Sequence, residues 1–300
     1  MKSTLKLLLN LILLIIINSC SSLSGTFFRD KIIVDMDIPQ IHDDGVALSI
    51  LEKSKKVSIE KLTISADQKQ LPFSLKNLGK VKSAIGRNDY ITESNAVSAM
   101  VDTLKEYPGE VVIVCFGPLT NLASLIKKHK SLVPNIKEVI ISGGVLFKEG
   151  KINKTSEYNF WKDPESANIV LKSGVKITLF GFDVASTVYL DNELFDEIRQ
   201  ARSKLSLFLT HELGSGKNGF YSQKKSMHIN SSIIAVYMIT ENLITNSKKY
   251  QLKVIEGKNK DRGKLVIDDK GPLIDLVLGI DEEIFYRNYF HEITKEVELL

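Results

Sequence analysis

Short apolar runs rich in β-branched residues recur along the chain and alternate with longer stretches of helical spacing. Five of these runs are expected to be strands that are apolar on both faces: Lys31–Val34, Lys61–Ser65, Val111–Phe116, Glu138–Ser142 and Lys176–Phe180. Helical spacing covers Gly45–Lys53, Ser74–Ile85, Leu119–Lys128 and Pro164–Lys172. This alternation predicts an α/β fold: an open, mostly parallel sheet with helices on both faces. Ligands bind such sheets beyond the carboxyl ends of the strands, so functional residues should directly follow a strand run.

The last third of the chain carries three further signals. Residues 199–226 predict a helix followed by a loop, because a cluster of Gly, Ser and Asn follows the apolar positions. Residues 251–270 predict a β-hairpin with a charged turn at 257–263, and a last helix is expected over 281–290. No repeat and no low-complexity linker divides the chain, which favours one domain over 31–300.

Composition excludes several classes of protein. With 43% hydrophobic and 25% charged residues, the chain has the balance of a folded globular protein. The 40 Lys and Arg against 36 Asp and Glu give a net charge of only +4, which does not favour nucleic-acid binding. The two cysteines exclude a disulfide scaffold, and Cys115 stands inside an apolar run, where it is expected to be a small buried hydrophobe.

The N-terminus has the pattern of a bacterial lipoprotein leader. Residues 1–19 are expected to be a signal peptide, with basic Lys2 and Lys6 before an apolar run that is too short for a membrane span of about 20 residues. Ile17–Cys20 resembles a lipobox, which implies a lipidated N-terminal Cys20, a tether over 20–30 and a location anchored in the bacterial cell envelope. The alternative is an uncleaved signal anchor whose cysteine is incidental.

Four carboxylates follow the first strand. Asp35 and Asp37 stand at its end, and Asp43 and Asp44 precede the next helix. Their mutual repulsion is costly unless a cation or a polyhydroxyl ligand compensates for it. The alternative for Asp43 is a helix N-cap.

At this point the chain resembles the inosine-uridine-preferring nucleoside hydrolases, whose N-terminal signature is a strand, Asp-x-Asp-Pro-Gly and an Asp-Asp pair. Here the signature is two residues longer, and Pro39-Gln40 replaces the usual turn. Four more segments resemble family motifs in unbroken order: Phe116–Ala123 with Gly-Pro-Leu-Thr-Asn-Leu, Ser142–Gly144, Glu157–Glu165 and Phe182–Val184.

The resemblance implies a set of site residues. The resemblance implies a metal ion bound by Asp37, Asp44 and the backbone carbonyl of Thr120. The expected ion is Ca²⁺, which prefers oxygen ligands. Asp43, Glu157 and Asn159 would hold the ribose hydroxyls, with Glu157 and Asn159 expected on one side of an extended segment. Asn159 could instead be only a turn residue.

The implied reaction is hydrolysis of the N-glycosidic bond of a ribonucleoside or related ribosyl compound by metal-activated water. Asp37 would accept the proton of the water, and His228 would protonate the leaving base. The expected partner is therefore a small nucleoside or riboside. Base specificity is not determined by the sequence, and neither is the oligomeric state, with a homo-oligomer among the options.

The chain also departs from the family pattern. No aspartate follows His228, so Asn230, Ser231 or Ser232 would have to offer a neutral oxygen, and His228 could be only a polar residue at a helix start. Where the family has Gly-Asn after the second strand, this chain has Asp67–Gln70, and the residue that contacts ribose stays open among these four. Asn153 is displaced from the position of the corresponding family asparagine.

Two other functions compete with the hydrolase. A non-catalytic ribose- or nucleoside-binding lipoprotein would keep the ribose ligands with a degenerate metal site. A haloacid-dehalogenase-like phosphatase would use Asp35 and Asp37, but that family needs Thr or Val where Pro39 stands.

Overall fold

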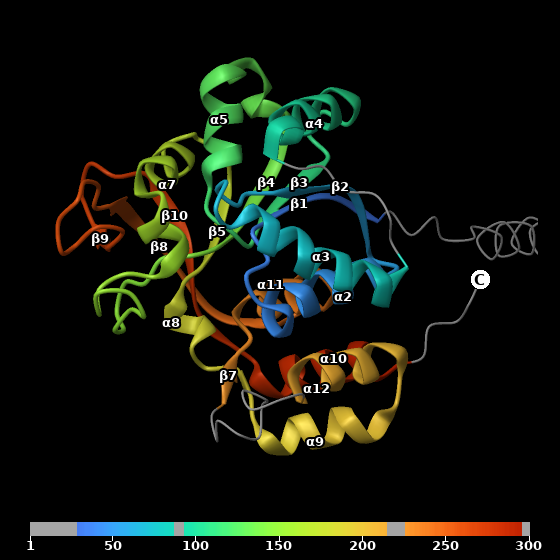
Figure 1. The fold of residues 1–300 in the computed structure, drawn as a ribbon. Helices are drawn as coiled ribbons and strands as arrows, with labels where there is room; N and C mark the ends of the chain where they lie inside the picture. The colour runs from blue at the N-terminus through green and yellow to red at the C-terminus, as the bar shows by residue number, and fades with distance from the viewer. Residues whose placement is uncertain (1–28, 87–92, 215–225, 296–300) are drawn as a thin grey trace, which may run out of the picture.

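The computed structural model describes residues 29–86, 93–214 and 226–295 (Figure 1). An eight-stranded sheet in the order β2-β1-β3-β4-β5-β10-β8-β9 forms its centre. The strands of this sheet are β1 (Asp30–Met36), β2 (Val57–Ile64), β3 (Val111–Cys115), β4 (Ile136–Ser142), β5 (Ile177–Phe180), β8 (Ile244–Val254), β9 (Leu265–Ile267) and β10 (Leu273–Ile280). The first five and β10 are parallel, whereas β8 pairs antiparallel with β10 and β9.

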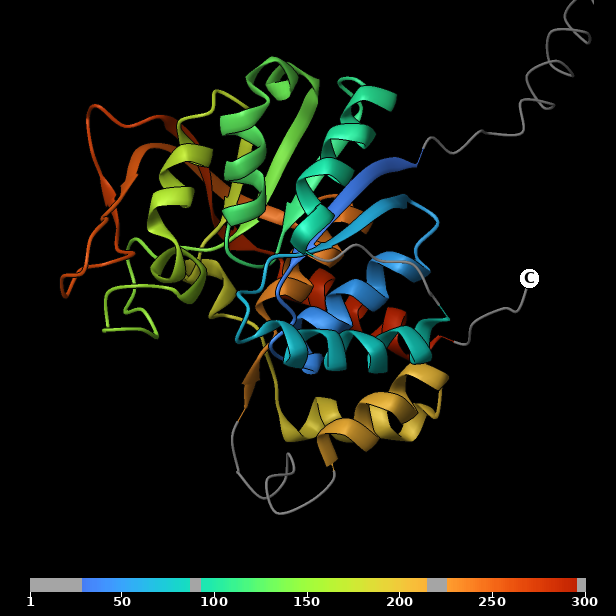
Figure 2. The same cartoon turned by 45° about the horizontal axis from the view of Figure 1, so that its top comes forward.

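Helices cover both faces of the sheet (Figure 2). The helices between the first five strands are η1 (Ile41–Gly45), α2 (Val46–Lys53), α3 (Leu71–Ile85), α4 (Glu93–Glu106), α5 (Thr120–Lys128), η2 (Lys130–Asn135), α6 (Tyr158–Lys162) and α7 (Pro164–Leu171). Those that follow β5 are α8 (Phe182–Ala185), α9 (Asn192–Ala201), α10 (Lys204–Gly214), α11 (Asn230–Ile239) and α12 (Glu282–Thr294). A small second sheet pairs β6 (Tyr189–Leu190) with β7 (Met227–His228).

Two hydrophobic cores lie on opposite faces of the sheet, because alternate residues of a strand point to opposite sides. In β1, Ile32 and Val34 pack into the core beneath α2, α3, α11 and α12. Ile33 packs into the other core, beneath α4, α5 and α7. The predicted α/β class with a mostly parallel, doubly covered sheet is confirmed.

The five predicted strands all form, with ends that differ by up to four residues. Cys115 is a fully buried free thiol, as expected. The late hairpin forms from β8 and β9, and the last helix extends four residues beyond its predicted end. The predicted helix and loop over 199–226 correspond to α10 and a segment, 215–225, that lies outside the described residues.

No helix within the described ranges is both long and apolar enough to cross a lipid bilayer. The predicted signal peptide, lipobox and most of the tether lie in residues 1–28, outside the part of the chain that the structure describes.

Candidate functional site

The acidic loop after β1 is held tightly by α3. Ile38 adopts a positive φ of 40°, a strained conformation for a β-branched residue, and it is fully buried. The Asn77 side chain donates to the Ile38 carbonyl at 3.1 Å, and the Ser74 hydroxyl donates to the Asp37 carbonyl. These contacts fix the direction in which Asp37 leaves the strand.

A glycine allows the neighbouring loop to approach Asp37. A Cβ atom on Gly117 would lie 2.8 Å from the Asp37 backbone nitrogen and 2.4 Å from the Ser65 hydroxyl oxygen. Only glycine fits here without displacing the acidic loop. The predicted motif at residues 116–123 therefore packs directly against Asp37.

Asp35 lies deeper than the other carboxylates. One of its oxygens accepts hydrogen bonds from the Thr63 hydroxyl at 2.6 Å and the Asn121 amide at 2.9 Å, while the other is buried without a partner among the described residues. Burial raises the pKa of Asp35 to about 7, although both hydrogen bonds favour the charged form.

Asp37, Asp43 and Asp44 form a group of interacting acids. Burial, together with the charges of Glu157 and Asp35, raises the pKa of Asp37 to about 7. Burial also raises the pKa of Asp44 well above its ordinary value, with added repulsion from Asp43 and Asp37. The three carboxylates are therefore close enough to oppose one another's ionisation.

The start of α11 completes this acidic group. The Ser231 backbone N–H donates to Asp43 at 2.7 Å, and the Ser231 hydroxyl donates to Asp44 at 2.6 Å. Burial raises the pKa of Asp43 to about 7 despite the backbone N–H groups that the helix directs at it. Asp43 thus binds the N-terminus of α11, and Ser231 is the residue of the 230–232 stretch whose side chain bonds to the acidic pair.

Glu157 and Asn159 do not lie on the extended segment that we predicted from their spacing. Asn159 is inside α6, and Glu157 is the N-cap of that helix. The cap explains the difference: the Glu157 carboxylate accepts hydrogen bonds from the backbone N–H groups of Asn159 and Phe160, in the first turn of the helix, and from that of Gly144, in the loop after β4. The Asn159 amide nitrogen donates to the Phe116 and Ser142 carbonyls, so Asn159 links three loops, with its side-chain oxygen available.

Thr120 begins α5, three residues after Gly117. Its hydroxyl donates to Asp163 at 2.6 Å, and Asp163 also caps α7. A cavity of about 230 Å³ lies here, lined among others by Thr120, Asp67 and Lys162. Lys162 forms an ion pair with Asp67 at 2.6 Å, and its charge also lowers the pKa of Asp37.

The sequence did not decide which of the four residues after β2, at 67–70, would contact ribose. Asp67 and Gln70 make side-chain contacts with other parts of the protein. Asp67 accepts hydrogen bonds from the backbone N–H groups of Lys69 and Gln70, in addition to the Lys162 ion pair. The Gln70 side chain donates to the Tyr158 hydroxyl at 2.6 Å. Both residues therefore connect the loop after β2 to α6.

His228 reaches the site from β7, which pairs with Tyr189 of β6. Its ring stands edge-on to Phe182, with 5.5 Å between ring centres, and its Nδ1 atom is buried without a described partner. Burial lowers the pKa of His228, and the charges of Lys151 and Lys148 lower it further. The imidazole is therefore mostly neutral at pH 7, which weakens it as a proton donor.

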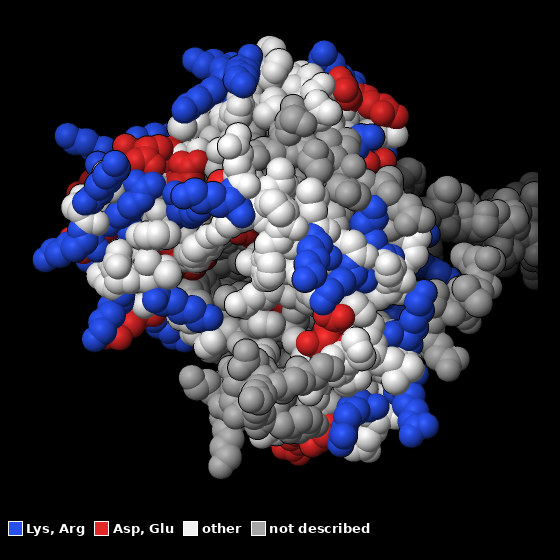
Figure 3. Space-filling view, viewed as in Figure 1, with Lys and Arg blue, Asp and Glu red and all other residues white. Residues whose placement is uncertain are grey.

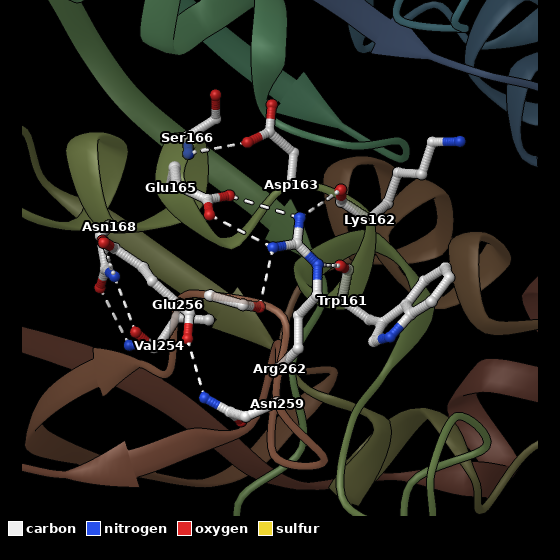
Figure 4. A network of polar contacts seen from close by, with 11 residues as sticks. Trp161, Lys162, Asp163, Glu165, Ser166, Asn168, Val254, Glu256, Asn259 and Arg262 are labelled. Atoms are coloured by element: carbon white, nitrogen blue, oxygen red, sulfur yellow. Dashed lines mark hydrogen bonds and ion pairs between the residues drawn. The ribbon is translucent and has the colours of Figure 1, made fainter.

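A late hairpin holds α6 in place. Arg262, in the turn after β8, donates to the Trp161 carbonyl at 2.9 Å and the Lys162 carbonyl at 3.1 Å, and it pairs with Glu165 (Figure 4). A Cβ atom on Gly263, whose φ is 79°, would lie 2.2 Å from the Trp161 Cα atom. The turn thus packs against the backbone of the helix that carries Asn159.

Sequence reasoning missed two lysines. Lys151 and Lys162 influence the pKa values of the acidic residues, but neither was selected from the motifs. The expectation that functional residues follow strands could have pointed to Lys151, which lies in the long segment after β4. The contact of Lys162 with Asp67, 95 positions away, leaves no local pattern.

The donor set suits a hard cation. Asp37 and Asp44 are buried carboxylates whose ionisation is opposed by their neighbours, and the free oxygen of Asp35 adds a further buried acceptor without a partner. In the described ranges no three side chains of His, Cys, Asp or Glu already converge to hold a metal ion. A metal site here would therefore need neutral oxygens beside its two carboxylates, as the Thr120 carbonyl would supply.

Fold and site together define an α/β protein with an acidic ligand-binding site at the carboxyl edge of a parallel sheet. A family model described as inosine-uridine preferring nucleoside hydrolase matches residues 82–287, so the chain belongs to this family. The acidic loop precedes the matched residues.

Individual relatives agree with this assignment. The chain is 35% identical over 119 residues to uridine nucleosidase 1 of Arabidopsis thaliana, which covers 40% of this chain but only 35% of the plant protein. It is 28% identical over 212 residues to the pyrimidine-specific ribonucleoside hydrolase RihA of Photobacterium profundum, covering 58% of this chain and 67% of the relative.

Solved structures match the fold over more of the chain. A plant nucleoside hydrolase superposes with a TM-score of 0.77 at 19% identity, covering 88% of this chain and 99% of its own. The inosine-uridine preferring nucleoside hydrolase of Bacillus anthracis has a TM-score of 0.73 at 16% identity, with the same coverage. At these identities the likeness establishes the fold.

Proposed function

We propose that this chain hydrolyses the N-glycosidic bond of a ribonucleoside or related ribosyl compound. The observation that carries the proposal is the meeting of Asp37, Asp43 and Asp44, all with raised pKa values, at the carboxyl edge of a nucleoside hydrolase fold. Buried acids that repel one another are costly for folding and are typical of catalytic sites.

In this proposal, different residues activate the water, bind ribose and hold the metal ion. Asp37 accepts the proton of the attacking water as the general base. Asp43 and the free side-chain oxygen of Asn159 bind ribose hydroxyls, and Glu157 adds a carboxylate already oriented by three backbone N–H groups. A calcium ion held by Asp37, Asp44 and the Thr120 carbonyl would supply a coordinated water of lowered pKa.

His228 is the proton donor to the leaving base in this proposal. Because burial and two lysines lower its pKa, little of it is protonated at pH 7. We therefore expect leaving groups that need no proton, such as nitrophenol, to depart fastest.

A second candidate is a non-catalytic riboside-binding protein. The observation that favours it is the neutral Ser231 hydroxyl bonded to Asp44, where a further carboxylate would strengthen a cation site. Both candidates share the ribose site and differ in turnover.

We also propose that the protein is a lipoprotein anchored through Cys20 in a bacterial cell envelope. The support is the lipobox-like Ile17–Cys20 after an apolar leader.

Kinetics with the full chain test the hydrolase proposal. With saturating calcium, Asp37→Asn should slow the hydrolysis of uridine, inosine and nitrophenyl riboside about 10²- to 10⁴-fold, because the general base is lost. Asp30→Asn, at the exposed start of β1, is the matched control and should keep the wild-type rate. Equal rates for wild type and Asp37→Asn on all three substrates would contradict the hydrolase, and ribose binding by such a protein would then favour the second candidate.

A further inference from the structure

Two lysine side chains beside the candidate ribose site have no carboxylate partner. The Lys148 ammonium donates to the Ser186 hydroxyl at 2.8 Å, and the Lys151 ammonium lies 4.8 Å from the centre of the Phe182 ring. Among the described residues, neither forms an ion pair. Figure 3 shows basic side chains, with acidic ones among them, where the segment between β4 and α6 lies, beside a hollow in the surface.

The segment that carries the two lysines is fixed by specific contacts. The Asp183 carboxylate accepts hydrogen bonds from the backbone N–H groups of Leu146, Phe147 and Lys148, at 2.7 to 3.0 Å. Further along, the Ile152 and Ser156 backbones pair with each other. The lysines therefore extend from a backbone that is anchored to α8 and to the start of α6.

In the part of the chain that the structure describes, the carboxylates of Asp43 and Glu157 form no ion pair with these lysines. The charges of Asp43 and Glu157 raise the pKa of Lys151, whereas burial lowers it. Both carboxylates already accept backbone N–H groups, Asp43 from the start of α11 and Glu157 from the start of α6. The ammonium groups are thus available to a ligand.

We propose that this corner binds a phosphate monoester, so that the site binds a 5′-phosphorylated riboside more tightly than the neutral riboside. Two ammonium groups offer enough N–H donors for the terminal oxygens of a phosphate, even with one N–H of Lys148 given to Ser186. Because Lys151 interacts with both Asp43 and Glu157, which we assign to the ribose hydroxyls, the anion belongs on the sugar. This inference rests on the ribose site of the proposed function.

Titration calorimetry with ribose and ribose 5-phosphate tests the inference, since neither ligand contains an N-glycosidic bond. In the full chain with saturating calcium, ribose 5-phosphate should bind at least tenfold more tightly than ribose. The preference should fall severalfold in Lys151→Gln and nearly vanish in the double variant with Lys148→Gln. Lys154→Gln, an exposed lysine on the same segment, is the matched control and should keep the preference.

The other outcomes separate the two proposals. Equal affinity of the wild type for both ligands would overturn the phosphate site alone, as would a preference that persists in the folded double variant. A preference that does not weaken between low and high salt would also overturn it, because a charge interaction at the surface must be screened. Binding of neither ligand by the folded protein would overturn the ribose site, and the phosphate site with it.

Discussion

At the scale of single residues, the site is built from acids that the fold holds in unfavourable surroundings. Asp35 illustrates this, because the sheet surrounds it while only one of its two oxygens is bonded. Its folded pKa of about 7 lies above the value near 3.9 of an unfolded chain, so the folded state binds its proton more tightly. Ionisation of Asp35 therefore opposes folding.

The pH dependence of stability follows from this sign. Relative to Asp35→Asn, the calcium-free wild type should gain about 2 to 4 kcal/mol of unfolding free energy as the pH falls from 8 to 4, since protonation removes a buried charge. Conversely, this contribution to the unfolding free energy is lost as the pH rises from about 4 to about 7. Urea unfolding at several pH values in EDTA measures the difference. A constant difference between the two proteins over this range would contradict it.

Ser231 offers a test of the cation site. Ser231→Asp should strengthen calcium binding at least tenfold, because it adds a charged oxygen next to Asp44. Ser231→Ala is the control, since it removes the hydroxyl without adding charge. Calcium titration of the three proteins measures the effect, and Asp44→Asn should weaken binding by a similar factor. Unchanged affinity in both Ser231→Asp and Asp44→Asn would place the metal elsewhere.

At the scale of elements, α6 depends on a hairpin about a hundred residues away. The Arg262 guanidinium holds two carbonyls of the helix, and the Ser156 hydroxyl donates to the Arg262 carbonyl at 2.6 Å. The turn is therefore anchored at both ends of α6, to Ser156 just before the Glu157 cap and to the last two residues of the helix.

Removing this anchor should affect both stability and the site. Arg262→Ala should lower the unfolding free energy by about 2 kcal/mol, because several hydrogen bonds from a charged donor are lost. It should also weaken ribose binding, since Asn159 lies in the loosened helix. Thermal unfolding and calorimetry measure the two effects. Lys260→Ala, on the exposed side of the same turn, is the control, and an equal effect of both variants would argue against a specific role of Arg262.

The elements were more predictable than the contacts between them. Strands such as Val111–Cys115 are continuous apolar runs, and burial on both faces leaves a signal within a few residues. The helix at Tyr158–Lys162 was misread as extended because its cap, Glu157, was assigned to a ligand from the family motif. The nearness of Lys151 to Asp43, and of Ser231 to Asp44, comes from the packing of distant loops and has no period in the sequence.

At the scale of the whole molecule, the folded domain and its proposed anchor are separate. The described part begins at residue 29, nine positions after Cys20, and β1 follows immediately. A tether of this length would hold the domain close to a membrane surface.

The anchor has its own test. The full chain should appear in the membrane fraction of a bacterial host, whereas Cys20→Ser should lose the lipid and a large part of this association, because no acyl chain can be attached. Fractionation and mass spectrometry of the N-terminus measure this. Cys115→Ser, at the buried thiol, is the control for the loss of a cysteine. An unmodified Cys20 with the leader still attached would contradict the anchor.

The contact between Arg262 and α6 also sets an order of events during synthesis. The ribosome makes the acidic loop first and the turn that fastens Asn159 more than two hundred residues later, roughly ten seconds or more at ordinary elongation rates. Ser231, which bonds to Asp43 and Asp44, is likewise made more than 180 residues after the loop. This acidic pair therefore receives its hydrogen-bond donors from α11 only after the strands β1 to β5 have been made.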